Sequence, residues 1–383
     1  MNRLRQRGFT LIELMVALVV SSLLVGMILA IFSRMSLAYR GQQQIAGVQQ
    51  VLAAARATME LDAKQAGLAM SQGFKIASDA GPGTMHSPIR ILNSSTGPDQ
   101  IAFFYADPAN QAVVAAVVGT WTSTPTVTVD SAAAFLAGDL VVLSAVDLTM
   151  TNPINPPADA NIAKYDACVL QIATPGGISG ANITFSTLPP WGIAGSAHCT
   201  PPIAGTMLYK LVAHAYRIDP DPARTAIGPL QGSLTGGLIG TAADNWTDLA
   251  FGFTDIQTAL AVYDGDGADT PDPGTDGDRE WYSGAMQQTL TQPIPKVDTY
   301  VAPIELSISL VARTDRDVEG IATQTTPDLI VNGTPNLTGT PDNNPIGDHP
   351  KVTLPWAIDP TLPGRIYRYT TFQVDLRNLG VGR

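Results

Sequence analysis

Hydrophobic residues are concentrated in one long run near the N-terminus, from Phe9 to Phe32. Glu13 is the only charged residue in this run, and the 19 residues from Leu14 to Phe32 carry no charge. As a helix, those residues would extend roughly 28 Å, which matches the ~30 Å hydrocarbon core of a bilayer. The pattern therefore predicts a transmembrane helix over residues 9–32.

Basic residues flank the run unevenly. Three arginines precede it, at positions 3, 5 and 7, and no basic residue follows it until Arg34. Because cytoplasmic flanks carry the excess of Lys and Arg, we expect a cytoplasmic N-terminus. A secretory signal peptide and a simple membrane anchor are the ordinary alternatives. The run is longer than a usual signal-peptide core, and no A-x-A-like cleavage site follows it directly.

Past Phe32, apolar residues recur at spacings of three and four, as on one buried face of a helix. This stripe consists of Ile45, Val48, Leu52, Ala55, Met59 and Ala66. The opposite face carries polar residues, among them Arg56, Glu60 and Lys64. We therefore predict one helix from about Thr10 to Gly67, roughly 85 Å long. Its second half, residues 33–70, is amphipathic and packs on the protein's own head.

From about residue 85 the pattern changes to short apolar runs between turn residues, which predicts strands. The expected strands are Gln100–Ala106, Ala112–Val118, Thr126–Asp130, Asp139–Asp147, Ala167–Ala173, Asn182–Thr187, Met207–Asp219, Leu249–Tyr263, Ile304–Arg313 and Ile366–Arg377. Ile304, Leu306, Ile308 and Leu310 alternate with polar residues, and Phe372, Val374 and Leu376 do the same, as in half-buried antiparallel sheet. The stretches 151–159 and 323–350 read as long surface loops.

Composition separates the same two regions. All 29 prolines follow residue 81, so the chain before that point can hold an uninterrupted helix. The net charge of −11 argues against nucleic acid as a partner, because nucleic-acid binding depends on clustered Lys and Arg. The common hydrolase, P-loop and zinc-protease motifs do not occur, so we do not expect an enzyme.

A specific motif stands at the start of the hydrophobic run. Gly8 ends a short basic leader and is followed by Phe9-Thr10-Leu11-Ile12-Glu13. This sequence resembles the cleavage motif of type IV pilins and pseudopilins. The resemblance implies that residues 1–8 are a leader removed after Gly8, and that Phe9 is then N-methylated. A carboxylate at membrane depth is costly without a partner, and the resemblance implies that Glu13 pairs with the terminal amine of a neighbouring subunit during assembly.

The resemblance also implies a type IV pilin-like α+β fold. In this fold the long N-terminal helix packs on a large head rich in antiparallel β-sheet, here residues 71–383, with long loops. The head resembles one branch, the PilW-type minor pilins, at four places in order along the chain. These are Gly97-Pro98-Asp99 before Ile101–Tyr105, Gly138-Asp139 before Leu140–Ser144, Ile256–Tyr263 before an acidic loop, and Phe372–Asn378.

This resemblance implies a structural protein that primes pilus assembly and sits in the pilus-tip complex, supporting twitching motility and adhesion. Two alternatives remain open: a J-type minor pseudopilin of a type II secretion system, and a tip-located binding or adhesin module. The implied partners are other minor pilins, the major pilin, the prepilin peptidase, the inner-membrane assembly platform and, before assembly, membrane lipid. The implied location is the bacterial inner membrane, with a periplasmic head, and then the extracellular pilus.

Cys168 and Cys199 are the only cysteines. A periplasmic head lies in an oxidising compartment, so we expect these two residues to form a disulfide. The alternative is a pair of buried free thiols.

The segment from Asp264 to Glu280 is strongly acidic and rich in Gly. Oxygen ligands at such short spacing suit Ca²⁺, and the expected ligands are Asp264, Asp266 and Asp269. The EF-hand template does not fit this segment, and the alternative is a solvated acidic loop. We expect no required cofactor, and Ca²⁺ is the one candidate ligand.

Overall fold

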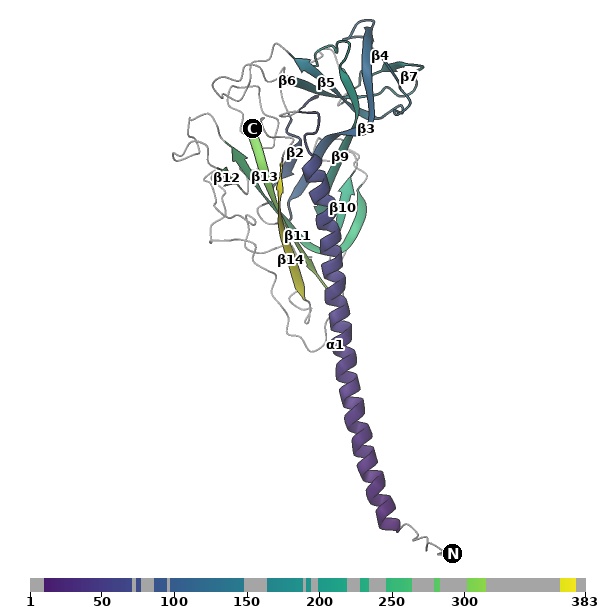
Figure 1. Ribbon diagram of the computed structural model, residues 1–383, viewed down its shortest axis with the longest axis vertical. Coiled ribbons are helices and arrows are strands. Elements are labelled where there is room, and N and C mark those ends of the chain that lie inside the picture. The colour runs from purple at the N-terminus through teal and green to yellow at the C-terminus, as the bar shows by residue number, and fades with distance from the viewer. Residues whose placement is uncertain are drawn as a thin grey trace, which may run out of the picture.

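A computed structural model describes residues 10–70, 74–76, 86–94, 97–147, 164–188, 191–193, 199–218, 228–233, 246–263, 279–282, 302–314 and 366–376. In these residues it contains the helix α1 (Leu11–Gln65) and the strands β1 (Lys75–Ile76), β2 (Ile89–Leu92), β3 (Gln100–Val118), β4 (Thr126–Val129), β5 (Leu140–Asp147), β6 (Lys164–Gln171), β7 (Ile178–Ser179), β8 (Asn182–Thr184), β9 (Met207–Ile218), β10 (Gly228–Ser233), β11 (Thr247–Tyr263), β12 (Arg279–Tyr282), β13 (Ala302–Arg313) and β14 (Tyr367–Asp375). The first half of α1 projects from the head, and the second half lies along it (Figure 1). The fold is the expected type IV pilin-like α+β arrangement.

Local sequence determines both ends of α1. Thr10 has an extended backbone and acts as the N-cap. No proline interrupts the 55 residues that follow. At the other end, Ala66 leaves helical geometry and Gly67 adopts a φ of 80°, a left-handed conformation that glycine favours after a helix. The observed bounds agree with the predicted helix to within two residues at each end.

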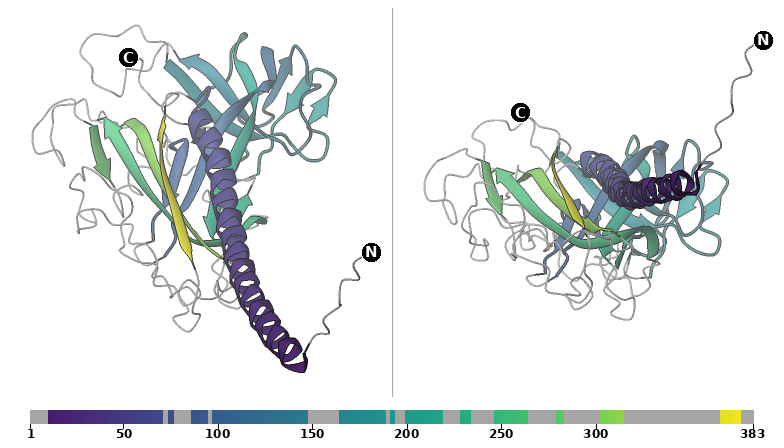
Figure 2. Two further views of the ribbon diagram at one scale, coloured as in Figure 1. Left: turned by 60° about the horizontal axis from the view of Figure 1, so that its bottom comes forward. Right: turned by 90° about the horizontal axis from the view of Figure 1, so that it is seen from below.

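The strands pair in the order β14-β13-β11-β10-β9-β3-β4-β8-β7, and almost every described pairing is antiparallel. The exception is β1, which pairs with β6 in parallel. The second half of α1 crosses the concave side of this curved sheet (Figure 2). The far ends of β3 and β9, with β4–β8, form a lobe beyond the C-terminal end of the helix, which we call the distal lobe (Figure 1).

Three hydrophobic clusters make up most of the described core. The first lies between α1 and the sheet, where the stripe residues of the helix meet side chains of β2, β3, β9, β11, β13 and β14. The second fills the distal lobe, and the third lies between the first two. Strand β3 contributes to all three: Phe103 to the first, Phe104 to the third and Val114 to the second. It therefore connects the helix-covered part of the head with the distal lobe.

The prediction of two strands where β3 runs was wrong. The residues between the two predicted runs do not form a turn, because β3 continues through them with a bulge. Along β9, Asp107 is opposite Lys210 and Gln111 is opposite Tyr209, so three residues of β3 have no counterpart. The Asp107 carboxylate accepts hydrogen bonds from the main-chain N–H of Ala109 and the side chain of Asn110, which closes the bulge.

The alternation predicted for β13 is confirmed on one face. Leu306, Ile308 and Leu310 are buried against the helix side of the sheet. The expectation that the other face is exposed was wrong, because Ser307 and Ser309 are also buried. Strand β13 lies between β11 and β14, so it is an interior strand. The burial of its successive residues shows that both of its faces are covered. Strand β14, at the end of the strand order, keeps the half-buried pattern. The loops predicted at 151–159 and 323–350 lie outside the described residues.

The Gly97-Pro98-Asp99 motif begins β3 and joins it to β11. Asp99 is completely buried, and its carboxylate accepts hydrogen bonds from the main chain and hydroxyl of Thr258, at 2.9 and 2.8 Å, and from the N–H of Ser94. A buried carboxylate is tolerated only when hydrogen bonds satisfy it. The motif thus has a structural role in the sheet.

Candidate functional site

The N-terminal end of α1 contains a reciprocal pair of polar side chains. Oε2 of Glu13 accepts hydrogen bonds from the N–H of Thr10, at 3.0 Å, and from its hydroxyl, at 2.9 Å. In return, the Thr10 hydroxyl accepts the N–H of Glu13 at 3.3 Å. This is a capping box, which satisfies main-chain donors at a helix start. Within one subunit, the carboxylate of Glu13 therefore already has a partner on its own chain. Gly8 and Phe9 lie outside the described residues.

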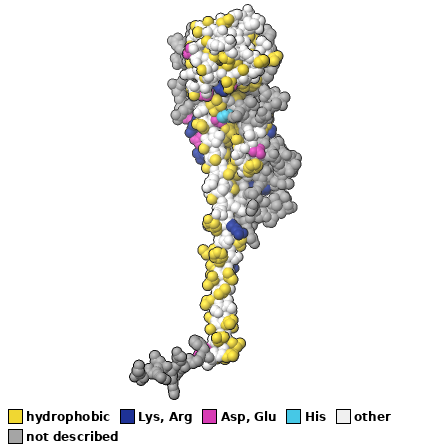
Figure 3. All heavy atoms as spheres, turned by 90° about the vertical axis from the view of Figure 1, so that its right-hand side faces the viewer, with side chains coloured by type: hydrophobic (Ala, Val, Ile, Leu, Met, Phe, Trp, Pro, Cys, Tyr) yellow, Lys and Arg dark blue, Asp and Glu magenta, His cyan; other side chains and the backbone are white. Residues whose placement is uncertain are grey.

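The first half of α1 is apolar on all sides, and no other described part of the chain covers it. Its large hydrophobic side chains, from Leu11 to Phe32, are each at least 50% exposed. Figure 3 shows hydrophobic side chains distributed along the whole of this segment below the head. Among the described residues, α1 is the one helix long and apolar enough to cross a membrane. A surface of this kind needs lipid or neighbouring apolar helices around it.

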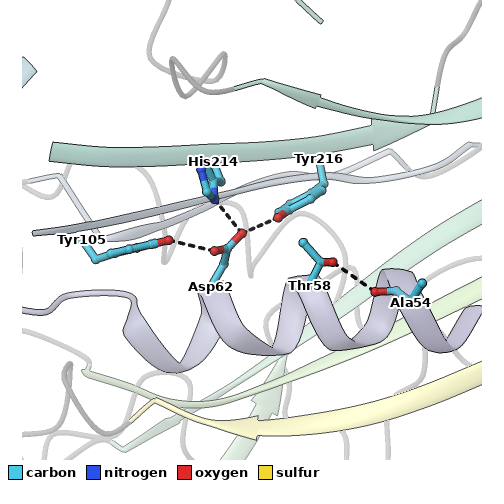
Figure 4. Close-up of polar contacts among 6 residues, drawn as sticks. All are labelled: Ala54, Thr58, Asp62, Tyr105, His214 and Tyr216. Atoms are coloured by element: carbon cyan, nitrogen blue, oxygen red, sulfur yellow. Dashed lines mark hydrogen bonds and ion pairs between the residues drawn. The ribbon is translucent and has the colours of Figure 1, made fainter. Parts of the chain in front are cut away.

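The second half of α1 is joined to the head by a buried polar cluster, which we call the Asp62 cluster: Asp62 of α1, Tyr105 of β3, and His214 and Tyr216 of β9. Figure 4 shows the three side chains converging on the carboxylate from the sheet. The Tyr105 hydroxyl donates to Oδ1 of Asp62 at 2.8 Å, and the Tyr216 hydroxyl donates to Oδ2. Nδ1 of His214 lies 2.9 Å from the same Oδ2.

The members of the Asp62 cluster differ in how deeply they are buried. Asp62 is 3% exposed, and Tyr105 and Tyr216 are nearly as buried. The His214 side chain keeps 29% of its surface exposed, so the ring forms the outer wall of the cluster. Directly after the helix, main-chain hydrogen bonds also attach the chain to β3. The N–H of Gly67 donates to the carbonyl of Phe104, and the N–H of Ala106 donates to the carbonyl of Leu68. The helix end and strand β3 are therefore held together by side chains and backbone.

The surroundings of the two tyrosines in the cluster raise their pKa. Burial raises the pKa of Tyr105 and Tyr216 above the ordinary value, and the negative charge of Asp62 raises it further. Both phenols therefore stay protonated and keep donating to the carboxylate at any physiological pH. On the solvent side of the same helix, the hydrogen bond from Lys64 lowers the pKa of Glu60. That residue also pairs with Arg56, in an exposed arrangement that adds little stability.

The structure places a disulfide between Cys168 and Cys199, whose Cα atoms are 5.7 Å apart. Both residues are buried in the cluster that fills the distal lobe. The Trp121 indole N–H donates to the carbonyl of Cys199 at 3.1 Å. The bond therefore holds the segment around residue 199 against β6.

The acidic residues Asp264, Asp266 and Asp269 lie outside the described residues, so calcium binding there stays a prediction. In the part of the chain that the structure describes, no three His, Cys, Asp or Glu residues come together as a metal site.

Comparison with known proteins identifies the N-terminal segment. Residues 3–29 match the family model of the prokaryotic N-terminal methylation motif. The chain carries a type IV pilin-like prepilin signal. In this pilin-like chain, the signal is of the kind that the prepilin peptidase processes and pilus-assembly machinery uses. The helix that follows the signal is suited first to a membrane and then to a filament. A structural role, not catalysis, fits such a signal. Searches of curated proteins and of solved structures give no match.

Sequence reasoning did not single out the Asp62 cluster. One signal was present, because Asp62 follows Met59 by three residues and precedes Ala66 by four, which places an acid within the apolar stripe. Its partners could not be recognised from the sequence. Tyr105 and His214 are 109 residues apart (214 − 105), and they come together only through the pairing of β3 with β9.

The raised pKa values of Tyr105 and Tyr216 predict a loss of stability at alkaline pH. In the unfolded chain, tyrosine loses its proton near pH 10, whereas both phenols stay protonated in the fold. Above that pH the unfolded state binds fewer protons, so the free energy of unfolding falls as pH rises. At neutral pH, Tyr216→Phe should cost about 1.5–3 kcal/mol, because it removes a hydrogen bond to a charged group.

Urea unfolding of the full-length protein in detergent, from about pH 8 to pH 11, measures both effects. The double variant Tyr105→Phe/Tyr216→Phe should show a shallower decline above pH 10 than the unaltered protein. Tyr369→Phe, at a 56% exposed position on β14, is the control. An equally steep decline in the double variant and the unaltered protein would contradict the assignment.

The disulfide predicts a stabilisation of roughly 3–4 kcal/mol for closing a loop of 31 residues. Reduction under native conditions, or replacement of both cysteines by alanine, should therefore lower the melting temperature of the full-length protein. A thiol assay on the denatured, unreduced protein should find no free thiol. Two reactive thiols in that assay would show that the bond does not form.

Proposed function

We propose that this protein is a minor type IV pilin, most like the PilW type, which primes pilus assembly and sits in the pilus-tip complex. After removal of residues 1–8, the subunit is held in the inner membrane by the first half of α1, with its head in the periplasm. It then leaves the membrane and enters a filament. In this role it supports twitching motility and adhesion.

One observation carries the proposal. The methylation motif at residues 3–29 leads directly into a helix whose first half is apolar on every side and whose second half is attached to a head. A membrane can solvate the first half before assembly, and the apolar helices of neighbouring subunits can replace the lipid afterwards. The same surface thus suits both states, which is what a filament subunit drawn from a membrane requires.

The size of the head supports a place at the filament tip. Residues 71–383 follow the helix, and the distal lobe extends the head beyond the helix end (Figure 1). A subunit repeated along a filament must fit between neighbours above and below it. A terminal subunit has no neighbour above, so a tip position accommodates a large distal lobe.

The proposal can be tested by deleting the gene and counting surface pili. We expect loss of pili and twitching, because a priming complex without one subunit should initiate few filaments. Re-expression of the full-length protein should restore both. Normal pili with lost protein secretion would instead identify a type II secretion pseudopilin, and normal pili with lost attachment would identify a tip adhesin.

We expect Glu13 to act in assembly and not in insertion, as the resemblance to type IV pilins implies. Glu13→Ala should still insert and still lose its leader, since neither step uses the carboxylate. Its incorporation into the minor-pilin complex should fall, because an assembled subunit would lose the pairing between Glu13 and a neighbouring Phe9 amine. Co-purification with the other minor pilins measures the effect.

Glu60→Ala is the matched control, because Glu60 is an acid on the same helix that faces solvent. It should co-purify at the level of the unaltered protein. If Glu13→Ala also co-purifies at that level and is equally expressed, the assembly role of Glu13 is wrong for this chain.

A further inference from the structure

The face of α1 that docks on the head is nearly uniform. Its buried apolar residues recur about once per turn and carry no polar group: Val48, Leu52, Ala55, Met59, Ala63 and Ala66. If the helix moved along its axis by one turn, about 5.4 Å, most of these residues would take a place vacated by another apolar residue, although of different size. Hydrophobic contact is non-directional, so it separates these two positions weakly.

Asp62 is the one charged residue among the buried residues of α1. Its three partners project from the same face of two adjacent strands, where His214 is opposite Phe103 and Tyr216 is opposite Ile101. Phe103, Ile101 and Tyr216 belong to the apolar cluster under the helix. The three side chains that satisfy the carboxylate of Asp62 are therefore gathered at one point of the described surface under the helix.

A displaced helix would lose this arrangement completely. The carboxylate of Asp62 would face apolar side chains, and the hydroxyls of Tyr105 and Tyr216 would lose their acceptor. A buried charge without its partner is strongly destabilising, far more so than the loss of ordinary contacts. A single buried polar residue sets the register of two-stranded coiled coils by the same physics.

We propose that Asp62 is a register-determining residue, which sets the axial position of the helix on the head. The main-chain bonds of Gly67 and Leu68 to β3 hold the segment after the helix, and Asp62 makes any displaced position of the helix itself unfavourable. Asp62 thereby sets the distance between the head and Glu13. Glu13 precedes Asp62 by 49 residues (62 − 13), which is about 74 Å of helix. In a filament, a fixed distance gives every head the same height above the helical core.

The test measures the helix position in the isolated full-length protein, in detergent with the native disulfide intact. Spin labels are attached to new cysteines at two exposed positions, Gln50 on α1 and Ala137 in the distal lobe. Because the distal lobe lies beyond the helix end (Figure 1), an axial shift changes the distance between the labels. Pulsed electron–electron double resonance then measures the distribution of the distance between the two labels.

The unaltered protein and the control Glu60→Leu should each give one narrow distance population. Asp62→Leu removes the same charge from the buried face and should give a second population, displaced by about one turn, ~5.4 Å. A single population at the unaltered distance in folded Asp62→Leu would overturn the proposal.

A second variant covers the case in which Asp62→Leu does not fold. Thr58 lies one turn before Asp62, and exchanging the two residues, Thr58→Asp/Asp62→Thr, keeps the composition and moves the carboxylate by one turn. The label distance should shift by about one turn as the carboxylate returns to its three donors. An unshifted distance, or failure of this variant to fold as well, would overturn the proposal. None of these measurements requires a filament, so they are independent of the function proposed above.

Discussion

The attachment of the second half of α1 to the sheet is the interaction on which the rest of the structure depends. The first half of α1 adds nothing to this attachment among the described residues, because its large hydrophobic side chains are each at least 50% exposed. In the described part of the chain, the attachment comes from residues from Gly41 onward, the first buried position of α1. There the helix buries one apolar face and a single carboxylate. The apolar face supplies most of the binding, and Asp62 supplies direction.

Strand β3 extends this attachment through the whole head. It begins directly after Asp99, which ties it to β11. It then passes beneath the helix end at Tyr105 and continues through the bulge at Asp107 into the distal lobe. One continuous strand and its partner β9 thus connect the part of the head under the helix with the distal lobe. The disulfide between Cys168 and Cys199 strengthens the far end of this path.

The two ends of α1 handle a carboxylate in different ways. Glu13 lies at an exposed helix start, where Thr10 satisfies it within the same chain. Its hydrogen bonds are local and could be exchanged for a partner on another subunit. Asp62 is enclosed by Tyr105, His214 and Tyr216, which belong to the folded head, so its bonds are part of the fold itself. The helix therefore carries an exchangeable acid at the end proposed to assemble and a fixed acid at the end that docks.

The sequence determined the features that depend on neighbouring residues. The apolar run, the apolar stripe after it, the absence of proline and the Gly8–Glu13 motif predicted the helix, its approximate bounds and the type of signal. Alternation along β13 and β14 likewise predicted which apolar side chains share one face of the sheet. These features follow from local periodicity and local hydrogen bonding, which are visible in one stretch of chain.

The tertiary structure decided what depends on distant residues. Only strand pairing shows that β3 continues through Asp107 as a bulge, and only burial in the fold shows that β13 is covered on both faces. Only the register of β3 against β9 brings Tyr105, His214 and Tyr216 to one point opposite the helix. The physical reason is that hydrogen-bond donors from any part of the chain can satisfy a buried charged group. An acid in an apolar stripe therefore indicates that partners exist, and the fold alone shows which residues they are.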